Sequence, residues 1–227
     1  MRVLAIDTAL AACSAAVLDV DRGGILAHES VPMERGHAEA LVPMIARVMS
    51  EAGIDFAELD RIAVTIGPGS FTGLRVGVAA ARGIALAASK PIVALTTLAS
   101  FAAPHISVDD TTPLLSAIDA RNEQLYIQLV GRGGRAIVAP RLAGLREALR
   151  LASGTPTRIV GSGAGLIQTA WPTDIPAPLF VETTPAPDID WVARLGAVAL
   201  DTTDAPKPLY LRNPDARPQD AFRLSRR

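Results

Sequence analysis

The residues with the clearest capacity for chemistry lie in the glycine-rich stretch GPGSFTG, residues 67–73. The stretch follows an apolar run that is typical of a buried strand, and it precedes a helical pattern. Glycines let backbone N–H groups approach a ligand, and a helix N-terminus carries partial positive charge, so phosphate is the expected ligand. However, no lysine stands where a P-loop requires one, and the spacing is not that of a dinucleotide fingerprint. A tight, closely packed strand-to-helix turn is an equally good interpretation.

A second candidate is the pair Asp7 and Thr8, which ends the first apolar run of the chain. A carboxylate at the end of a strand could hold a metal–nucleotide complex. The candidate nucleotide or phosphate site therefore comprises Asp7, Thr8, Gly67, Gly69, Ser70 and Gly73. Asp119 and Arg121 occupy the equivalent place in the second half, where we favour a turn cap or an internal ion pair, because the arginine would neutralise the carboxylate.

The sequence offers no catalytic residue and no metal site. Its histidines, His28, His37 and His105, have no partner at metal-ligand spacing, and its one cysteine, Cys13, lies among small residues and is expected to be buried. The net charge of −1 does not indicate a basic surface that would bind a polyanion. The basic residues near the end of the chain are expected to form a solvated terminus: Arg217, Arg223, Arg226 and Arg227.

Similar elements occur twice, in the same order. The first half predicts strands over 2–6, 14–20 and 25–31, a helix over 37–52, a strand over 61–66, a helix over 74–89 and a strand over 92–95. The second half predicts strands over 114–118 and 125–130, a helix over 141–153, a strand over 158–160 with a glycine loop to 165, an irregular stretch over 171–187 and a helix over 191–200. We expect a duplicated α/β protein with a lobe over 1–103, a smaller lobe over 104–200, a tail over 201–227, and a cleft between the lobes.

The second predicted helix is rich in small residues, with Gly73, Gly77 and Ala81 spaced by four. Such a helix lets another backbone come close, either within its own lobe or at a seam with another subunit. The longest apolar stretch, residues 76–88, contains Arg82 and is too short to cross a bilayer. The N-terminal residues do not have the pattern of a signal peptide. A soluble protein of the reducing cytoplasm is expected, with no membrane partner.

Several segments together resemble the TsaB (YeaZ) family of tRNA threonylcarbamoyladenosine biosynthesis proteins: VLAIDTA, ERGHAEALVPMI, IGPGSFTGLRVGVAAARGIAL, IDARNEQLY and PLYLRNPDARP. The resemblance runs from Arg2 to Pro218. It implies the duplicated actin/Hsp70/sugar-kinase-like (ASKHA) fold. It also implies a non-catalytic partner subunit that binds and activates TsaD, which threonylcarbamoylates the adenosine next to the anticodon of tRNAs reading ANN codons.

The resemblance also implies partners and an interface. TsaD and TsaE would bind this chain, TsaC would act upstream, tRNA contact would be indirect, and the chain alone would be a homodimer. It implies no cofactor of the chain itself, with any ATP or ADP at the subunit interface. The implied seam comprises residues of the two helices in the first lobe: His37, Leu41, Met44, Ile45, Val48, Leu74, Gly77, Ala80, Ala81 and Ile84.

TsaD carries a His-x-x-x-His metal pair, and the aligned positions here are Thr97 and Phe101. Neither side chain suits iron or zinc, which favours the partner subunit over the transferase. One alternative is a self-sufficient ATPase, kinase or transferase of the same fold, which would bind nucleotide tightly on its own. A glycoprotease-like metallopeptidase is a minor alternative, which a metal assay would test.

Overall fold

The computed structural model describes residues 1–200 and 205–212. The first repeat contains β1 (Arg2–Asp7), β2 (Ala12–Asp19), β3 (Gly24–Pro32), α1 (His37–Ala52), β4 (Arg61–Gly67), α2 (Phe71–Ala88), β5 (Ile92–Thr96) and α3 (Thr97–Ala102). The second contains β6 (Leu114–Asp119), β7 (Gln124–Val130), β8 (Ala136–Gly144), α4 (Leu145–Ser153), β9 (Arg158–Val160), α5 (Ala164–Thr169), β10 (Phe180–Glu182) and α6 (Ile189–Val198). Three short 3-10 turns join them: Phe56–Glu58, Ala103–His105 and Arg132–Gly134.

The two repeats build sheets with the same strand order. Sheet 1 runs β3-β2-β1-β4-β5, and sheet 2, followed in the matching direction, runs β8-β7-β6-β9-β10. In sheet 1, β2 is antiparallel to both β1 and β3, whereas β4 is parallel to both β1 and β5. Sheet 2 repeats this pattern around β6. The duplicated, two-lobed α/β architecture of the ASKHA type is therefore confirmed.

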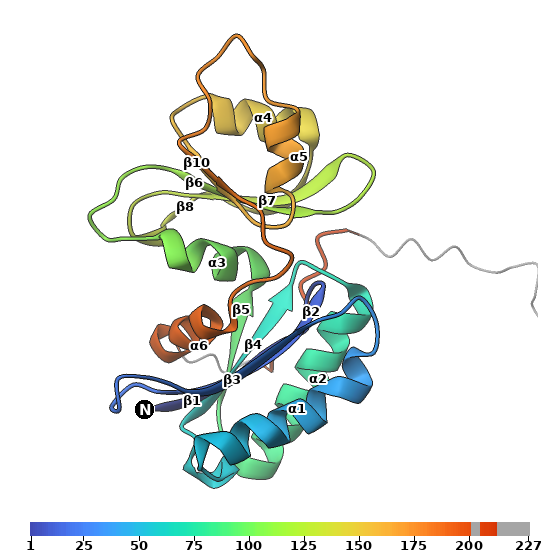
Figure 1. Ribbon diagram of the computed structural model, residues 1–227, viewed down its shortest axis with the longest axis vertical. Coiled ribbons are helices and arrows are strands. Elements are labelled where there is room, and N and C mark those ends of the chain that lie inside the picture. Colours follow the sequence, from blue (N-terminus) through green and yellow to red (C-terminus); the bar gives the residue numbers. More distant parts are fainter. Residues whose placement is uncertain (201–204, 213–227) are drawn as a thin grey trace, which may run out of the picture.

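The last helix of each repeat packs against the sheet of the other repeat. Figure 1 shows α1 and α2 on one face of sheet 1, α6 on its other face, α3 on the near face of sheet 2, and α4 and α5 beyond that sheet. The side chains of Ile189, Val192 and Ala193 in α6 are buried against residues of sheet 1. Those of Leu98, Phe101 and Ala102 in α3 are buried against residues of sheet 2. Because of this exchange, the inner face of each sheet is covered only when both repeats are present.

The helices of the first lobe form for local reasons that the sequence displays. In α1, the buried residues Leu41, Met44, Ile45 and Val48 recur at helical spacing, and the helix ends at Gly53, whose φ of 65° suits glycine. The α2 helix begins at Phe71, earlier than the expected residue 74. The reason is an N-cap: the hydroxyl of Ser70 accepts a hydrogen bond from the N–H of Gly73.

Three expectations for the second lobe were wrong in detail. Residues 141–144 belong to β8 rather than to the predicted helix, because pairing with β7 outweighs the helix propensity of their side chains. The stretch expected to be irregular contains β10, which pairs with β9. The last helix begins at Ile189, because the Asp188 carboxylate accepts the N–H of Asp190 as its cap.

After α6, the described part of the tail crosses between the lobes. The N–H of Leu209 donates to the carbonyl oxygen of Ile66 at 2.7 Å, and Nη1 of Arg212 donates to the carbonyl oxygen of Ala120 at 3.2 Å. We call residues 205–212 the strap. The remainder of the predicted 201–227 tail, including its four basic residues, lies outside the described residues. The predicted lobe limits at 103 and 200 stay a prediction.

One described helix, α2, is long and apolar enough to cross a membrane by length and composition alone. In the fold, its residues Leu74, Val78, Ala81 and Ala85 are buried in the first lobe. One side of α2 therefore lies against sheet 1, while the other side of the helix is exposed.

The exchange of α6 predicts a contrast between two helical glycines. A Cβ at Gly196 would lie 2.3 Å from Cβ of Ala63 in sheet 1, whereas a Cβ at Gly83 would meet no heavy atom within 4 Å. Gly196→Ala should lower the free energy of unfolding by about 1–3 kcal/mol through overpacking. Gly83→Ala should raise it by about 1 kcal/mol through helix propensity. Urea unfolding of the two variants checks this, and equal effects would contradict the docking of α6.

The link between β3 and α6 predicts a pH effect. His28 Nδ1 lies 2.6 Å from an Asp190 carboxylate oxygen, and this hydrogen bond raises the pKa of His28. Because the pKa of His28 is raised in the folded state, the His28–Asp190 interaction stabilises the fold fully below about pH 6.5, the pKa of an unfolded histidine. This stabilisation is lost as the pH rises through the pKa of His28 in the folded protein. His28→Gln should therefore lower Tm at pH 5.5 but not at pH 9. The effect should stay below about 1 kcal/mol because His28 is mostly exposed.

Candidate functional site

The glycine stretch holds the start of α2 against the turn between β1 and β2. A Cβ at Gly73 would lie 2.0 Å from the carbonyl oxygen of Thr8, and one at Gly69 would lie 2.2 Å from that of Ala9. The hydroxyl of Thr8 donates to the carbonyl oxygen of Gly73 at 2.7 Å, and the N–H of Ser70 donates to that of Ala9 at 2.7 Å. Glycine is required here because two backbones are in contact. This contact supports the interpretation of the glycine stretch as a closely packed strand-to-helix turn.

Asp7 lies beneath this turn and is fully buried. Its Oδ1 accepts hydrogen bonds from the hydroxyl of Thr65 and from the N–H of Ala9, while Oδ2 has no partner. Burial raises the pKa of Asp7, with the Thr65 and Ala9 hydrogen bonds opposing the shift. The environment therefore favours the neutral carboxyl over the ionised carboxylate that would bind a cation.

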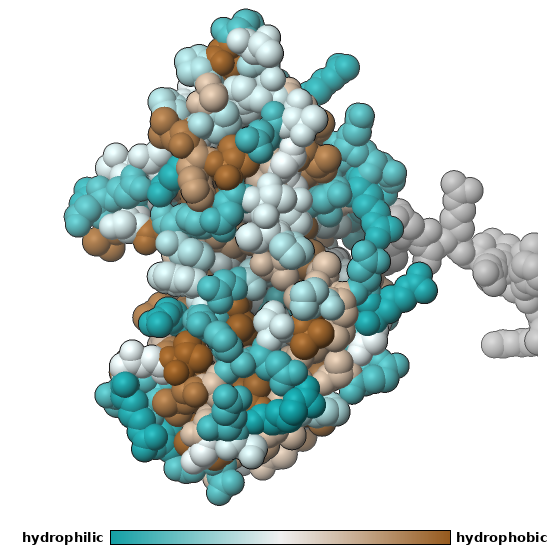
Figure 2. Space-filling view, viewed as in Figure 1, coloured by the Kyte–Doolittle hydropathy of each residue, from teal (hydrophilic) through white to brown (hydrophobic). Residues whose placement is uncertain are grey.

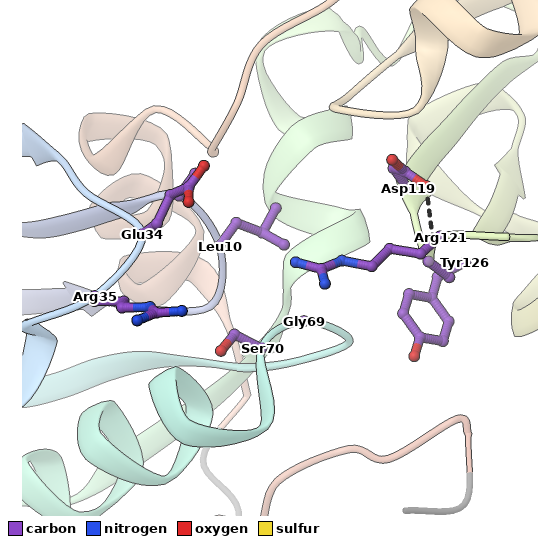
Figure 3. Close-up of a pocket in the computed structure, with 10 residues that line it drawn as sticks. Leu10, Glu34, Arg35, Gly69, Ser70, Asp119, Arg121 and Tyr126 are labelled. Carbon is purple, nitrogen blue, oxygen red and sulfur yellow. Dashed lines mark hydrogen bonds between the residues drawn. The ribbon is translucent and has the colours of Figure 1, made fainter. Parts of the chain in front are cut away.

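A cavity of about 370 Å³ lies between the lobes. Its lining comes from the β1–β2 turn, the β3–α1 connection, the turn before α2, the end of β6 with the following turn, and β7: Leu10, Ala11, Glu34, Arg35, Gly69, Ser70, Asp119, Ala120, Arg121 and Tyr126. Figure 3 shows Ser70 at the edge of the first lobe and the Arg121 side chain reaching across from the second.

The predicted nucleotide residues lie in three places. Gly69 and Ser70 line this cavity, whereas Asp7, Thr8 and Gly73 are buried behind it. Gly67 lies under the strap, where a Cβ would approach the carbonyl oxygen of Leu209 to 2.9 Å. The six residues are thus neighbours, but only two of them face the cavity. Nucleotide binding by this set stays a prediction.

The turn after β6 supplies residues that the sequence pattern did not single out for the cavity. The Asp119 carboxylate accepts the N–H of Arg121 at 2.7 Å, which confirms its capping role. Arg121, Asn122 and Glu123 have φ values of 64°, 53° and 56°. Three successive left-handed residues without glycine are unusual, and such conformations concentrate at functional sites. No local sequence signal indicates this conformation.

The predicted subunit seam must be corrected. His37, Leu41, Met44, Ile45, Val48, Leu74, Gly77 and Ala81 are buried inside the first lobe, and Ala80 and Ile84 are partly buried against the same core. The eight buried residues cannot contact a second protein in this fold, whereas Ala80 and Ile84 are partly accessible and stay predicted seam residues. A Cβ at Gly77 would lie 2.5 Å from the Thr8 hydroxyl, so a large residue there would disrupt the lobe rather than block a partner. The small residues of α2 on this side serve packing within the lobe.

The opposite side of α1 and α2 is exposed. The face of the first lobe seen in Figure 2 likewise mixes hydrophobic with hydrophilic residues. The exposed side of the two helices presents several apolar or small residues, including Val42 and Leu86, of which 62% and 84% are accessible. The other exposed α2 residues are Phe71, Thr72, Arg75, Ala79, Arg82, Gly83 and Ala87. We call the exposed residues of α2 together with Val42 the outer face. At one end of it, Phe71 stacks with Tyr210 of the strap at 5.1 Å, and Nε of Arg75 donates to the Tyr210 hydroxyl.

Comparison with known proteins decides the family. A family model described as TsaD, tRNA N6-adenosine threonylcarbamoyltransferase, matches residues 18–166, which is more than half of the 227 residues. The chain belongs to the TsaD family. Within it, the chain falls in the TsaB/YeaZ group. It is 39% identical over 127 residues to the tRNA threonylcarbamoyladenosine biosynthesis protein TsaB of Escherichia coli, a match covering 56% of this chain and 53% of the relative.

The TsaB/YeaZ assignment also holds over most of the fold. YeaZ from Pseudomonas aeruginosa is 26% identical, with a TM-score of 0.78 over 92% of this chain and 99% of that structure. An uncharacterized protein of Mycobacterium tuberculosis is 32% identical over 95% of this chain and 94% of its own length. By sequence, the chain spans about half the length of the curated TsaB relatives it matches.

The TsaB/YeaZ chain contains no group of three or more His, Cys, Asp or Glu residues placed to hold a metal ion among residues 1–200 and 205–212. Thr97 and Phe101, where the resemblance led us to expect the histidine pair of TsaD, are both buried in α3. The thiol of Cys13 is buried, as expected, and desolvation raises its pKa to about 11, so it is protonated at neutral pH.

The environment of Asp7 predicts opposite effects for two substitutions. Since its folded pKa is raised, stability falls as the pH rises from about 3.9 through the folded value. Asp7→Asn cannot ionise and keeps an acceptor for Thr65 and Ala9, so it should be more stable than the parent chain at pH 8 and similar near pH 4. Asp7→Ala leaves those donors unpaired and should lose about 2 kcal/mol. Chemical unfolding at both pH values measures this, and an Asn variant weaker than the parent at pH 8 would disprove it.

Proposed function

We propose that this chain is a non-catalytic partner subunit that binds and activates TsaD in the threonylcarbamoylation of the adenosine next to the anticodon of tRNAs reading ANN codons. The observation that carries the proposal is its membership of the TsaB/YeaZ group, whose curated members are named for tRNA threonylcarbamoyladenosine biosynthesis. A partner role requires a surface that binds another protein, and we assign that function to the outer face.

The chemistry of the fold supports a role without catalysis. Thr97 and Phe101 replace the metal pair of the TsaD sibling, and neither is a usual ligand of iron or zinc. Asp7, the carboxylate at the end of β1, is buried with a raised pKa and does not line the interlobe cavity. Both observations favour a subunit that contributes a surface rather than reacting groups.

The outer face suits a protein partner. Its exposed alanine and glycine residues on α2 allow another helix to approach closely, and Leu86 and Val42 provide apolar area at its two helices. Phe71, Arg75 and Tyr210 add the aromatic and guanidinium groups that are enriched in protein interfaces. We propose that TsaD and a second copy of this chain compete for this face, so that homodimer and heterodimer exclude each other.

The remaining assignments follow from the same proposal. TsaE would join the pair, TsaC would supply its threonylcarbamoyl donor upstream, and tRNA would be held mainly by the partners, consistent with a net charge of −1. The chain would work in the cytoplasm and need no cofactor of its own. Any ATP or ADP of the assembly would lie at the subunit interface.

Leu86→Glu tests the outer face. The side chain is 84% exposed, so the change should leave the fold intact but place a charge in the apolar interface. Titration calorimetry with TsaD from the same organism should show affinity weakened by at least about tenfold, or roughly 1.4 kcal/mol. Light scattering of the isolated variant should show a shift from dimer to monomer.

Val198→Glu on α6 is the matched control. Val198 is 78% exposed but lies on a helix outside the outer face, so this variant should bind TsaD like the parent chain. Equal affinity of the parent chain and both variants would remove the outer face from the proposal. If the parent chain bound no TsaD and bound ATP tightly by itself, the partner role would be wrong and a self-sufficient enzyme would take its place.

A further inference from the structure

The interlobe cavity is lined by charged side chains of both signs, contributed by both lobes. Glu34 and Arg35 come from the connection between β3 and α1, and Asp119 and Arg121 come from the end of β6 and the turn after it. Figure 3 shows Arg121 directed towards the first lobe, with Glu34 and Arg35 on the opposite wall. The polar wall also carries the hydroxyls of Ser70 and Tyr126.

Three of these charged groups are not used by the fold. Among the described residues, no hydrogen bond or ion pair involves the side-chain carboxylate of Glu34 or the guanidinium groups of Arg35 and Arg121. Elsewhere in the chain, comparable charges pair with each other, as Arg47 does with Glu29 at 2.7 Å. Opposite charges that face one cavity without pairing leave room for a ligand between them.

The backbone holds Arg121 in place despite its uncommon conformation. Arg121, Asn122 and Glu123 are all left-handed, and the turn is closed by the N–H of Gln124 donating to the carbonyl oxygen of Arg121 at 3.0 Å. Asp119 caps the turn, and the strap bonds the intervening Ala120. Strain of this kind persists where the surrounding structure enforces it, and it favours a functional position for the arginine.

The arrangement excludes some ligands by charge and size. A polyphosphate would meet the carboxylates of Glu34 and Asp119, and the turn that could cradle phosphate is occupied by the contact of Gly69 with Ala9. About 370 Å³ is at the small end of ligand cavities, so a small molecule fits best. A molecule that carries both a carboxylate and an ammonium group matches both signs of charge.

We propose that the interlobe cavity binds a small zwitterion, a free α-amino acid. Its carboxylate would pair with Arg121 and Arg35, since guanidinium groups bind carboxylates through paired hydrogen bonds. Its ammonium group would lie towards Glu34. The hydroxyl of Ser70 would favour a side chain that forms hydrogen bonds. This binding is separate from the outer face and needs no partner protein.

The test uses the isolated full-length chain at pH 7.5. Titration calorimetry and thermal unfolding would be run with glycine, L-serine and L-threonine, and with acetate, methylammonium and magnesium ATP as comparison probes. We expect one saturable site for the amino acids with a Kd of about 1 mM, and no saturation with acetate or methylammonium, which carry one charge each. Arg121→Gln and Glu34→Gln should each weaken binding at least about tenfold.

Arg146→Gln is the control, because Arg146 is an exposed arginine on α4 that does not line the cavity. It should bind amino acids like the parent chain, and all three variants should keep the parent Tm without ligand. The proposal is overturned if no amino acid binds up to 20-fold above the expected Kd, roughly 20 mM. It is also overturned if magnesium ATP binds instead, or if Arg146→Gln weakens binding as much as Arg121→Gln.

Discussion

The backbone-to-backbone contact between the start of α2 and the β1–β2 turn is the constraint on which the rest of the first lobe depends. Gly69 and Gly73 touch the carbonyl oxygens of Ala9 and Thr8, so no side chain fits between them. This contact closes the space in front of Asp7 and fixes the direction of α2. Because α2 has that direction, its inner side fills the core and its outer side is presented to solvent.

The architecture could be predicted from the sequence because burial is periodic along the chain. Leu41, Met44, Ile45 and Val48 mark the inner side of α1, and matching strand and turn signals revealed the duplication. Strands were missed where long-range pairing decides them, as in β8 and β10. The exchange of α3 and α6 also left no local signal, because an apolar helix face does not specify which sheet covers it.

The candidate sites were predicted less well, for related reasons. Helical spacing identified a face of α1 and α2 but could not tell core from interface, so the seam was assigned to buried side chains such as Leu41 and Ala81. The glycine stretch was found, yet glycine serves close packing and ligand approach equally well. Arg121 enters the cavity through a left-handed turn made of ordinary residues, and propensity does not indicate such a turn.

Because α6 packs on sheet 1, that sheet can be fully covered only late in the synthesis of the chain. The strands of sheet 1 leave the ribosome long before residues 189–198, so the face formed by Val3, Ala5 and Ala63 stays uncovered until most of the chain has been made. The first repeat contains every strand of its sheet but lacks the helix that covers this face. A nascent chain paused within the second repeat would expose this apolar face, because the helix that covers it has not yet been made.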